Sequence, residues 1–352
     1  MISILNSKKT TFKGSFQKIL AKILPAFFIL GFASCESIYD KEVDCDPYYY
    51  IKFVYDMNMD YANAFHTKVN SVELFVFSKD TGELVWQNSE SGEALAQEGY
   101  RMRVYIQPGD YDFVAWCGLE NNEDHFTIPA DIAKKEDLSC TMAREYDDDG
   151  TPFQNKNLYS LFHGRLEATL EDLPGDHVYE MPLIKDTNNI NFSLQEVNGN
   201  SIDPADYEIK MTAKNGAMAF DNSLSDDQDI LFKPYRQVSG AAFMQGRADD
   251  DATDGKNVVL AEIATSRLIA NHNPMIEVRD VKNNWTIYSV PLVKWALMLK
   301  SEQYSRMGNQ EYLDREDEFN VVLYFNSQKY LAISVMINGW HMVINDDTVL
   351  GQ

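Results

Sequence analysis

The sequence predicts an all-β protein built from packed β-sandwiches. Apolar residues recur at every second position in many short runs, which is the spacing of half-buried strands. Turn residues separate these runs about every ten residues, and helical spacing is persuasive only over residues 292–304. The chain of 352 residues is 45% hydrophobic and 12% aromatic, which indicates folded domains rather than disorder. Many short strands with frequent turns are typical of sandwiches.

The first predicted strand covers residues 48–55. Along it, four residues of one face alternate with their neighbours: Tyr49, Ile51, Phe53 and Tyr55. Further strands of the N-terminal half are predicted over residues 72–77, 84–86, 102–106, 111–116, 166–170 and 178–184. A turn at residues 79–82 joins the second strand to the third. Pro108 followed by Gly109 predicts that the strands over 102–106 and 111–116 pair as a hairpin.

A domain boundary is predicted near residues 185–189, which read Lys-Asp-Thr-Asn-Asn. It divides the folded part into an N-terminal sandwich over 48–186 and a C-terminal sandwich over 187–352, each long enough to bury its own core. The strands predicted for the second half cover residues 190–194, 207–211, 276–278, 319–325, 331–337 and 340–344.

The N-terminal segment has the layout of a secretory signal. Five lysines and no acidic residue precede an apolar run over residues 23–32, which is too short to span a membrane. Two small residues, Ala33 and Ser34, then lead to Cys35. This order predicts a signal peptide over residues 1–34, a lipid attached to Cys35 and a lipidated linker over 35–47. The alternative is an ordinary signal peptide whose cleavage site happens to fall near a cysteine.

The predicted signal peptide and lipid determine where the protein is located and the net charge of the mature chain. Each buried methylene of an acyl chain contributes about 0.8 kcal/mol, so two or three chains hold a protein on a membrane. Removal of residues 1–34 changes the net charge from −23 to −28, which excludes nucleic acid as a partner. The sequence therefore predicts a membrane-attached lipoprotein that binds no nucleic acid.

The remaining cysteines do not form a disulfide framework. Cys45, Cys117 and Cys140 are an odd number and allow at most one bridge. Cys117 and Cys140 could pair outside the cytoplasm, or both could be buried free thiols.

No catalytic, metal-binding or cofactor-binding residues are predicted. The six histidines lack the spacing of helical metal ligands, and there is no CxxC pair, nucleophile elbow or phosphate-binding loop. A carboxylate pair for glycoside hydrolysis has no spacing rule and stays open. The acidic runs at 147–149 and 249–255 do not place ligands as a calcium loop requires, so they are interpreted as solvated loops. Tyr48–Tyr50 and the tryptophans are interpreted as core rather than as a sugar-stacking platform.

Several longer strings resemble the FimB-like anchor lipoproteins of type V (Bacteroidales-type) fimbriae. Besides the signal ending at Cys35, these strings cover residues 53–58, 64–66, 72–77, 108–118, 163–164, 310–315 and 337–340. The resemblance implies two tandem transthyretin-like β-sandwich domains. It also implies that the protein tethers a fimbrial shaft subunit (a fimbrillin) to the outer membrane through lipid. Acidic residues after Cys35 resemble the export signals of surface lipoproteins, which implies a surface-exposed position.

The same resemblance implies assembly by β-strand exchange, in which a neighbour's C-terminal strand fills the groove left by a removed first strand. In the superfamily, Arg-specific proteases remove that strand from shaft subunits. This chain has no arginine before Arg101, so a cut that releases residues 48–55 is disfavoured. An anchor that keeps its first strand would terminate the fibre.

The candidate donor strand is the last segment, residues 340–350, with Trp340, Met342 and Ile344 on one face. The alternative is that these residues simply complete the second sandwich. For the whole protein, the alternatives are a fimbrial tip adhesin or glycan-binding surface lipoprotein and, less directly, a secreted hydrolase.

Overall fold

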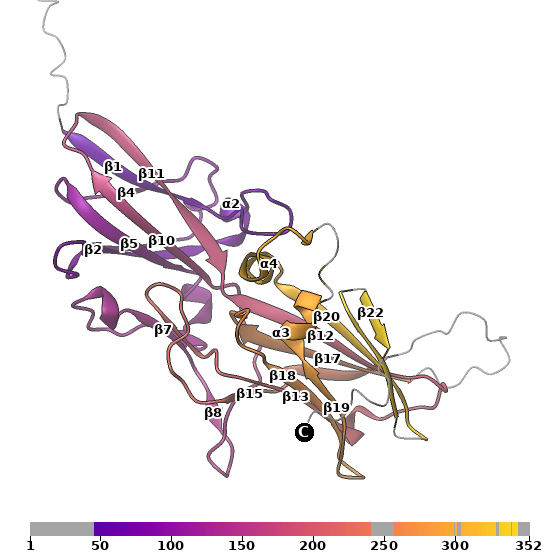
Figure 1. Ribbon diagram of the computed structural model, residues 1–352. Helices are drawn as coiled ribbons and strands as arrows, with labels where there is room; N and C mark the ends of the chain where they lie inside the picture. Colours follow the sequence, from indigo (N-terminus) through magenta and orange to yellow (C-terminus); the bar gives the residue numbers. More distant parts are fainter. Residues whose placement is uncertain are drawn as a thin grey trace, which may run out of the picture. The chain divides into compact units, whose positions relative to one another are not determined.

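The structure is a computed structural model that describes residues 46–240, 257–298, 300, 304–328, 331–338 and 340–343 (Figure 1). The predicted all-β class is confirmed, because the described residues form several packed sheets and only short helices. The α-helices are α2 (Phe65–Lys68), α3 (Leu292–Met298) and α4 (Asn309–Arg315). Short 3-10 helices within the described ranges include η1 (Glu120–Asn122), η2 (Lys135–Asp137) and η3 (Pro204–Asp206). No helix of the described ranges is long and apolar enough to cross a membrane.

The N-terminal half forms a seven-stranded sheet with the order β3-β2-β5-β10-β11-β1-β4. Its strands are β1 (Pro47–Val54), β2 (Ser71–Ser78), β3 (Leu84–Ser91), β4 (Met102–Val104), β5 (Gly109–Cys117), β10 (Phe162–Leu170) and β11 (Gly175–Lys185). Val72 of β2 and Val104 of β4 stand near opposite ends of this order, yet both belong to one buried cluster. The sheet therefore folds around its own core.

The predicted hairpin between residues 102–106 and 111–116 is wrong. β4 pairs with β1, with Tyr49 opposite Val104 and Ile51 opposite Met102. Both sides of β5 are occupied, since it pairs with β2 on one side and with β10 on the other. The Pro–Gly turn thus carries the chain from one end of the sheet to its interior. The hairpin predicted between β2 and β3 is confirmed.

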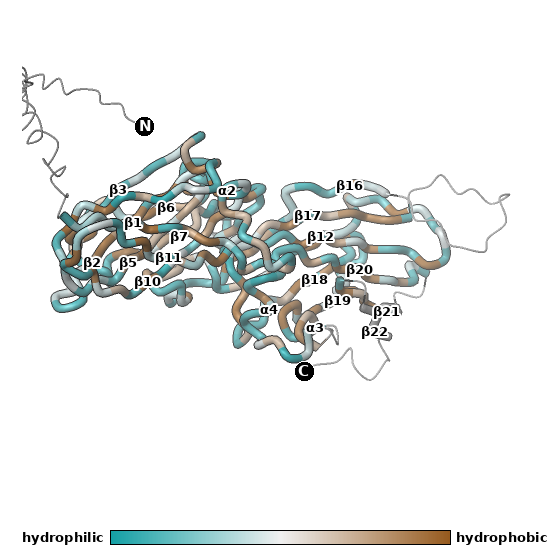
Figure 2. The backbone as a smooth tube through the Cα atoms, turned by 90° about the horizontal axis from the view of Figure 1, so that it is seen from above, coloured by the Kyte–Doolittle hydropathy of each residue, from teal (hydrophilic) through white to brown (hydrophobic). Residues whose placement is uncertain are grey.

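Two six-stranded sheets pack face to face in the rest of the structure. One has the order β16-β17-β12-β20-β21-β22 and the other the order β19-β18-β13-β15-β9-β8. The first comprises β12 (Thr187–Glu196), β16 (Arg236–Gly240), β17 (Val258–Ser266), β20 (Glu318–Asn326), β21 (Leu331–Ile337) and β22 (Trp340–Val343). The second comprises β8 (Glu145–Tyr146), β9 (Pro152–Gln154), β13 (Tyr207–Ala213), β15 (Ile230–Phe232), β18 (Met275–Asp280) and β19 (Trp285–Pro291). Apolar stretches along these strands, seen in Figure 2, form the core between the sheets.

The two halves of the chain share sheets. β8 and β9 precede the boundary predicted at residues 186/187, yet β9 runs parallel to β15 in the second six-stranded sheet. A three-stranded sheet likewise joins β6 (Phe126–Thr127) and β7 (Ser139–Met142) to β14 (Ala217–Ala219). The domain limits 48–186 and 187–352 stay a prediction.

The helix expected over residues 292–304 is shorter than its apolar pattern indicates. α3 ends at Met298, and a separate helix, α4, begins at Asn309. Both helices contribute buried residues to the core of the second half.

Candidate functional site

The first strand lies inside its sheet. β1 is flanked by β11 and β4, and its burial alternates along the strand. Tyr49, Ile51 and Phe53 are at most 2% exposed, and Tyr55, just beyond the strand, is 5% exposed. Full burial of such side chains contributes about 1.5–3 kcal/mol each. β1 is therefore a structural part of the N-terminal core.

Aromatic contacts hold β1 against the rest of this core. Phe53 stacks on Phe65 of α2 with ring centroids 5.5 Å apart, and Phe65 stacks on Tyr100 at 5.9 Å. Tyr55 meets Phe162 of β10 edge to face at 4.8 Å. Burial raises the pKa of Tyr55 far above its usual range, so this phenol stays neutral.

The outer face of β1 carries cations rather than a bare aromatic surface. Arg103 lies over the ring of Tyr48 at 4.2 Å, and Arg101 lies over the ring of Tyr50 at 3.9 Å. Arg101 also forms an ion pair of 2.7 Å with Asp176. The interpretation of residues 48–50 as core therefore holds for Tyr49 alone. The first arginine of the chain is engaged with β1 itself.

The candidate donor strand lies at a sheet edge. β22 pairs only with β21 in the order of its sheet, with Ile337 opposite Trp340 and Val335 opposite Met342. Its other side offers main-chain groups that no described strand pairs with. Ile344 lies outside the described residues, as do the predicted lipidation site Cys35 and the acidic run 249–255.

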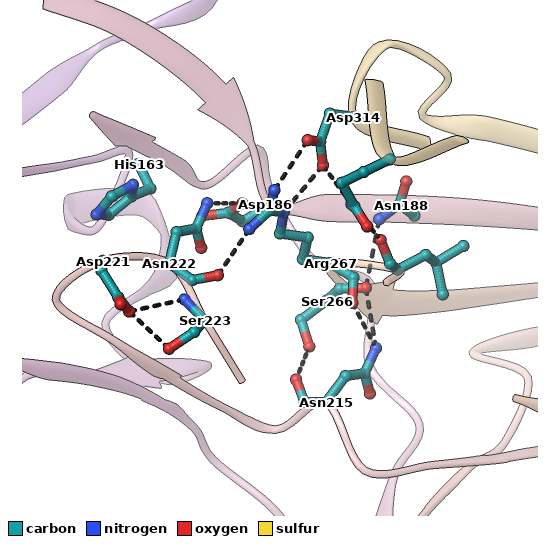
Figure 3. A network of polar contacts seen from close by, with 12 residues as sticks. His163, Asp186, Asn188, Asn215, Asp221, Asn222, Ser223, Ser266, Arg267 and Asp314 are labelled. Atoms are coloured by element: carbon teal, nitrogen blue, oxygen red, sulfur yellow. Dashed lines mark hydrogen bonds and ion pairs between the residues drawn. The ribbon is translucent and has the colours of Figure 1, made fainter. Parts of the chain in front are cut away.

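A buried polar network lies where β11 leads into β12 (Figure 3). Arg267, which follows β17, binds Asp314 of α4 through two hydrogen bonds of 2.9 and 2.8 Å. Its Nη1 donates to Asn222 O at 2.6 Å, and its Nε lies 3.8 Å from Asp186 Oδ1. Asn222 Nδ2 donates to the same Asp186 oxygen at 2.9 Å. One guanidinium thus joins two carboxylates and a turn.

Burial decides the protonation of this network. It raises the pKa of Asp186 to about 7, although Arg267 and Asn222 oppose the shift. Asp186 Oδ2 and Asn222 Oδ1 have no hydrogen-bond partner within the part of the chain that the structure describes. Nearby, burial lowers the pKa of His163 to about 4, so this neutral ring donates from Nε2 to Phe220 O at 2.9 Å. The hydrogen bonds of this network join side chains to other side chains and to the main chain, which indicates a structural role.

Several strings of the family resemblance meet at this network. Gln310 donates to Asp314 at 2.9 Å within α4. Arg315, at the end of the same helix, donates to the main-chain oxygens of Asp56 and Asn58 at 2.9 and 3.1 Å. The strings 53–58, 163–164 and 310–315 thus lie together at one junction. Sequence reasoning identified these strings but not the contacts between them.

The cysteines and the first acidic run, which the sequence analysis considered, make contacts within the folded chain. Cys117 and Cys140 are buried free thiols, which confirms one of the two possibilities left open, and burial raises the pKa of both. Asp147 in the first acidic run forms an ion pair of 2.9 Å with Lys233. Among the described residues, no three His, Cys, Asp or Glu side chains gather as a metal site would require.

Comparison with known proteins identifies relatives over nearly the whole chain. The minor fimbrium anchoring subunit Mfa2 of Porphyromonas gingivalis is 23% identical over 327 residues, which are 90% of this chain and 93% of that protein. A crystal structure of a Bacteroides thetaiotaomicron putative adhesin is 31% identical with a TM-score of 0.71, over 86% of this chain and 99% of that one. A second structure from this species, described as putative polysaccharide binding proteins, is 27% identical with a TM-score of 0.72 and the same coverage. The model of the fimbrillin-A associated anchor proteins Mfa1 and Mfa2 matches residues 41–346, and the chain belongs to this family.

Proposed function

We propose that this protein is a non-catalytic anchor subunit of a fimbrium, held at the outer membrane by lipid on Cys35. The supporting observation is that β1 fills the interior of its own sheet, with Tyr49, Ile51 and Phe53 buried. In strand exchange, a subunit accepts a neighbour's strand only where its own first strand has left. A chain that keeps β1 accepts no further subunit at that position and terminates the fibre. Membership of an anchor-protein family supports the same function.

The link to the shaft is proposed to run through the C-terminal strand. β22 pairs with the sheet on one side only, so its release breaks a single ladder of main-chain bonds. In this proposal Trp340, Met342 and Ile344 fill pockets of the neighbouring fimbrillin, and main-chain bonds supply affinity. The lipidated linker over 35–47 then joins the last subunit to the membrane surface.

Mass spectrometry of the protein extracted from its native membrane tests the anchor function. The expected result is an acylated Cys35 joined to an intact 48–55 segment, with a fimbrillin co-purifying. A Cys35→Ser variant serves as the control and should leave the membrane fraction. An unacylated terminus, or one cut beyond residue 55, would contradict the proposal.

The donor strand is tested by deleting residues 341–352. The deletion should free fimbriae into the medium while the anchor stays folded; loss of the folded protein would favour the alternative that these residues only complete the sheet. Met342→Lys and His341→Lys form a matched pair, because successive strand residues face opposite sides. Only the first substitution should weaken shaft attachment.

A tip adhesin or glycan-binding surface lipoprotein is the second candidate. It is favoured by the descriptions of the two Bacteroides thetaiotaomicron structures as a putative adhesin and as putative polysaccharide binding proteins. A tip subunit has no need to donate a strand. Fimbriae that stay attached after the 341–352 deletion would therefore support this second function.

A further inference from the structure

A groove of about 840 Å³ opens beside the end of the seven-stranded sheet. The ends of β2 and β3 form its floor, and residues 119–132 form its wall. Cross-strand register pairs Ser71 with Ser91, Glu73 with Ser89, and Phe75 with Gln87, which places these six side chains on one face. The floor is therefore polar along most of its length.

The charge of the groove is of one sign. Glu73, Glu90, Glu120 and Glu123 contribute carboxylates, and no lysine, arginine or histidine is among the described residues that line it. Glu73 is half-buried, and within the described part of the chain it has no hydrogen-bond or ion-pair partner. Desolvation raises its pKa. Among the described residues Glu73 thus lacks a counter-charge.

The groove runs along an open strand edge. β3 is the last strand of its sheet, and the described part of the chain covers only its beginning: Leu84 N–H donates to Ala133 O at 2.9 Å, and Lys135 N–H donates to Gly82 O at 3.0 Å. Beyond that point residues of the segment 126–132 line the groove as its wall. Residues 86–91 contain no lysine or proline, the residues that usually block edge pairing. This edge is open to an added strand.

We propose that this groove docks an extended segment of a partner protein that carries a lysine or arginine facing Glu73. The main chain of the segment continues the sheet beyond β3, and its basic side chain supplies the missing counter-charge. A sugar fits less well, because Phe75 and Phe126 are only 5% and 2% exposed and offer no stacking face. A metal ion fits less well, because the described residues hold no cluster of three ligands. This surface is distinct from β1 and β22, and the proposal goes beyond the anchor function.

A photo-crosslinking amino acid placed at Ser89 tests the proposal in cells that make the full chain. Ser289 is the matched control, since it is an exposed serine on β19, an edge strand of another sheet. The expected result is an adduct at Ser89 and none at Ser289. The partner peptide joined at Ser89 should contain a lysine or arginine within two residues of the joined atom. Glu73→Lys should reduce the adduct about tenfold or more, and Glu73→Gln about threefold.

The Glu73→Gln variant separates docking from folding. Removal of a desolvated charge without a partner should leave the unfolding midpoint unchanged or raise it, so a lower adduct yield cannot reflect unfolding. The proposal is overturned if cells with folded protein give no adduct. It is also overturned if the adduct joins a glycan, a second copy of this chain or a segment without a basic residue. An adduct yield that both Glu73→Lys and Glu73→Gln leave unchanged would overturn it as well. Chains lacking residues 341–352 should still give the adduct, which distinguishes this surface from strand donation.

Discussion

Arg267 is the residue on which the buried polar network depends. It is the cation that faces Asp186, which is fully buried, and Asp314, which is 8% exposed. Removal of one partner from a buried ion pair leaves an uncompensated charge and costs about 3–5 kcal/mol. Arg267→Met should therefore lower the free energy of unfolding by that amount, measured by urea denaturation at pH 7. Arg236→Met is the control, because its 2.6 Å pair with Glu262 is exposed and should contribute at most about 1 kcal/mol. Equal losses in the two variants would contradict this account.

Asp186 makes stability depend on pH in a defined direction. Its folded pKa of about 7 lies above the value of an unfolded aspartate, because burial disfavours the carboxylate. The unfolded chain therefore loses this proton first as pH rises, and the folded state loses stability between about pH 4 and pH 7. Asp186→Asn should show no gain in the free energy of unfolding near pH 4 and a growing gain toward pH 7. A gain that is the same at both pH values would exclude Asp186 as the source.

At the scale of elements, substitutions on the two faces of β1 test whether this strand is part of the core. Phe53 is 1% exposed and contacts two other rings, so Phe53→Ala should cost about 3–5 kcal/mol of unfolding free energy. Tyr50 lies on the opposite face under Arg101, and Tyr50→Ala should cost about 0.5–1 kcal/mol. Denaturation of the two variants side by side measures the difference. If both changes were mild, β1 would not be part of the core.

The elements that sequence reasoning predicts are those whose pattern is local. β1, β12 and β20 each have alternating residues over a long run, and β2 is an apolar run interrupted by Glu73 alone; these strands are found where expected. β6, β8, β9 and β14 are two or three residues long, which is too short for periodicity to mark them, and β9 and β14 pair with strands far along the chain. The false hairpin has the same cause, because the turn at Pro108–Gly109 says nothing about which strands already flank β5.

The buried polar network was also not predictable from sequence, because its contacts join residues far apart in the chain. Arg267 and Asp314 are 47 positions apart, and Asp186 and Asn222 are 36 apart, so their contacts leave no spacing motif. A conformational requirement explains one residue of the resemblance: Gly118 has φ +87°, and a Cβ there would lie 2.2 Å from Ser160 O. Family strings thus mark positions that the fold restricts, even where the reason is invisible in the sequence.

At the scale of the whole molecule, the proposed anchor function depends on the first strand, which lies between β11 and β4 in its sheet. A chain that begins at residue 56 would lose β1, and its sheet would be left with an open place between β11 and β4. Tyr49, Ile51 and Phe53 would then be missing from the N-terminal core. The truncated chain should therefore unfold at a lower temperature than the full chain or aggregate, because its apolar groove is exposed to water.

A synthetic peptide of residues 47–55 should restore this truncated chain. The peptide can regain the main-chain pairing with β4 and β11 and bury the same face, so it should raise the unfolding temperature in proportion to its concentration. A peptide with Phe53→Asp is the control, since a carboxylate cannot enter the aromatic stack of Phe65 and Tyr100 without a large desolvation cost. Thermal unfolding with each peptide distinguishes the two. Rescue by the native peptide alone would mean that β1 occupies a groove that another strand can fill, as the proposed function requires. A truncated chain as stable as the full one would mean that β1 closes no groove.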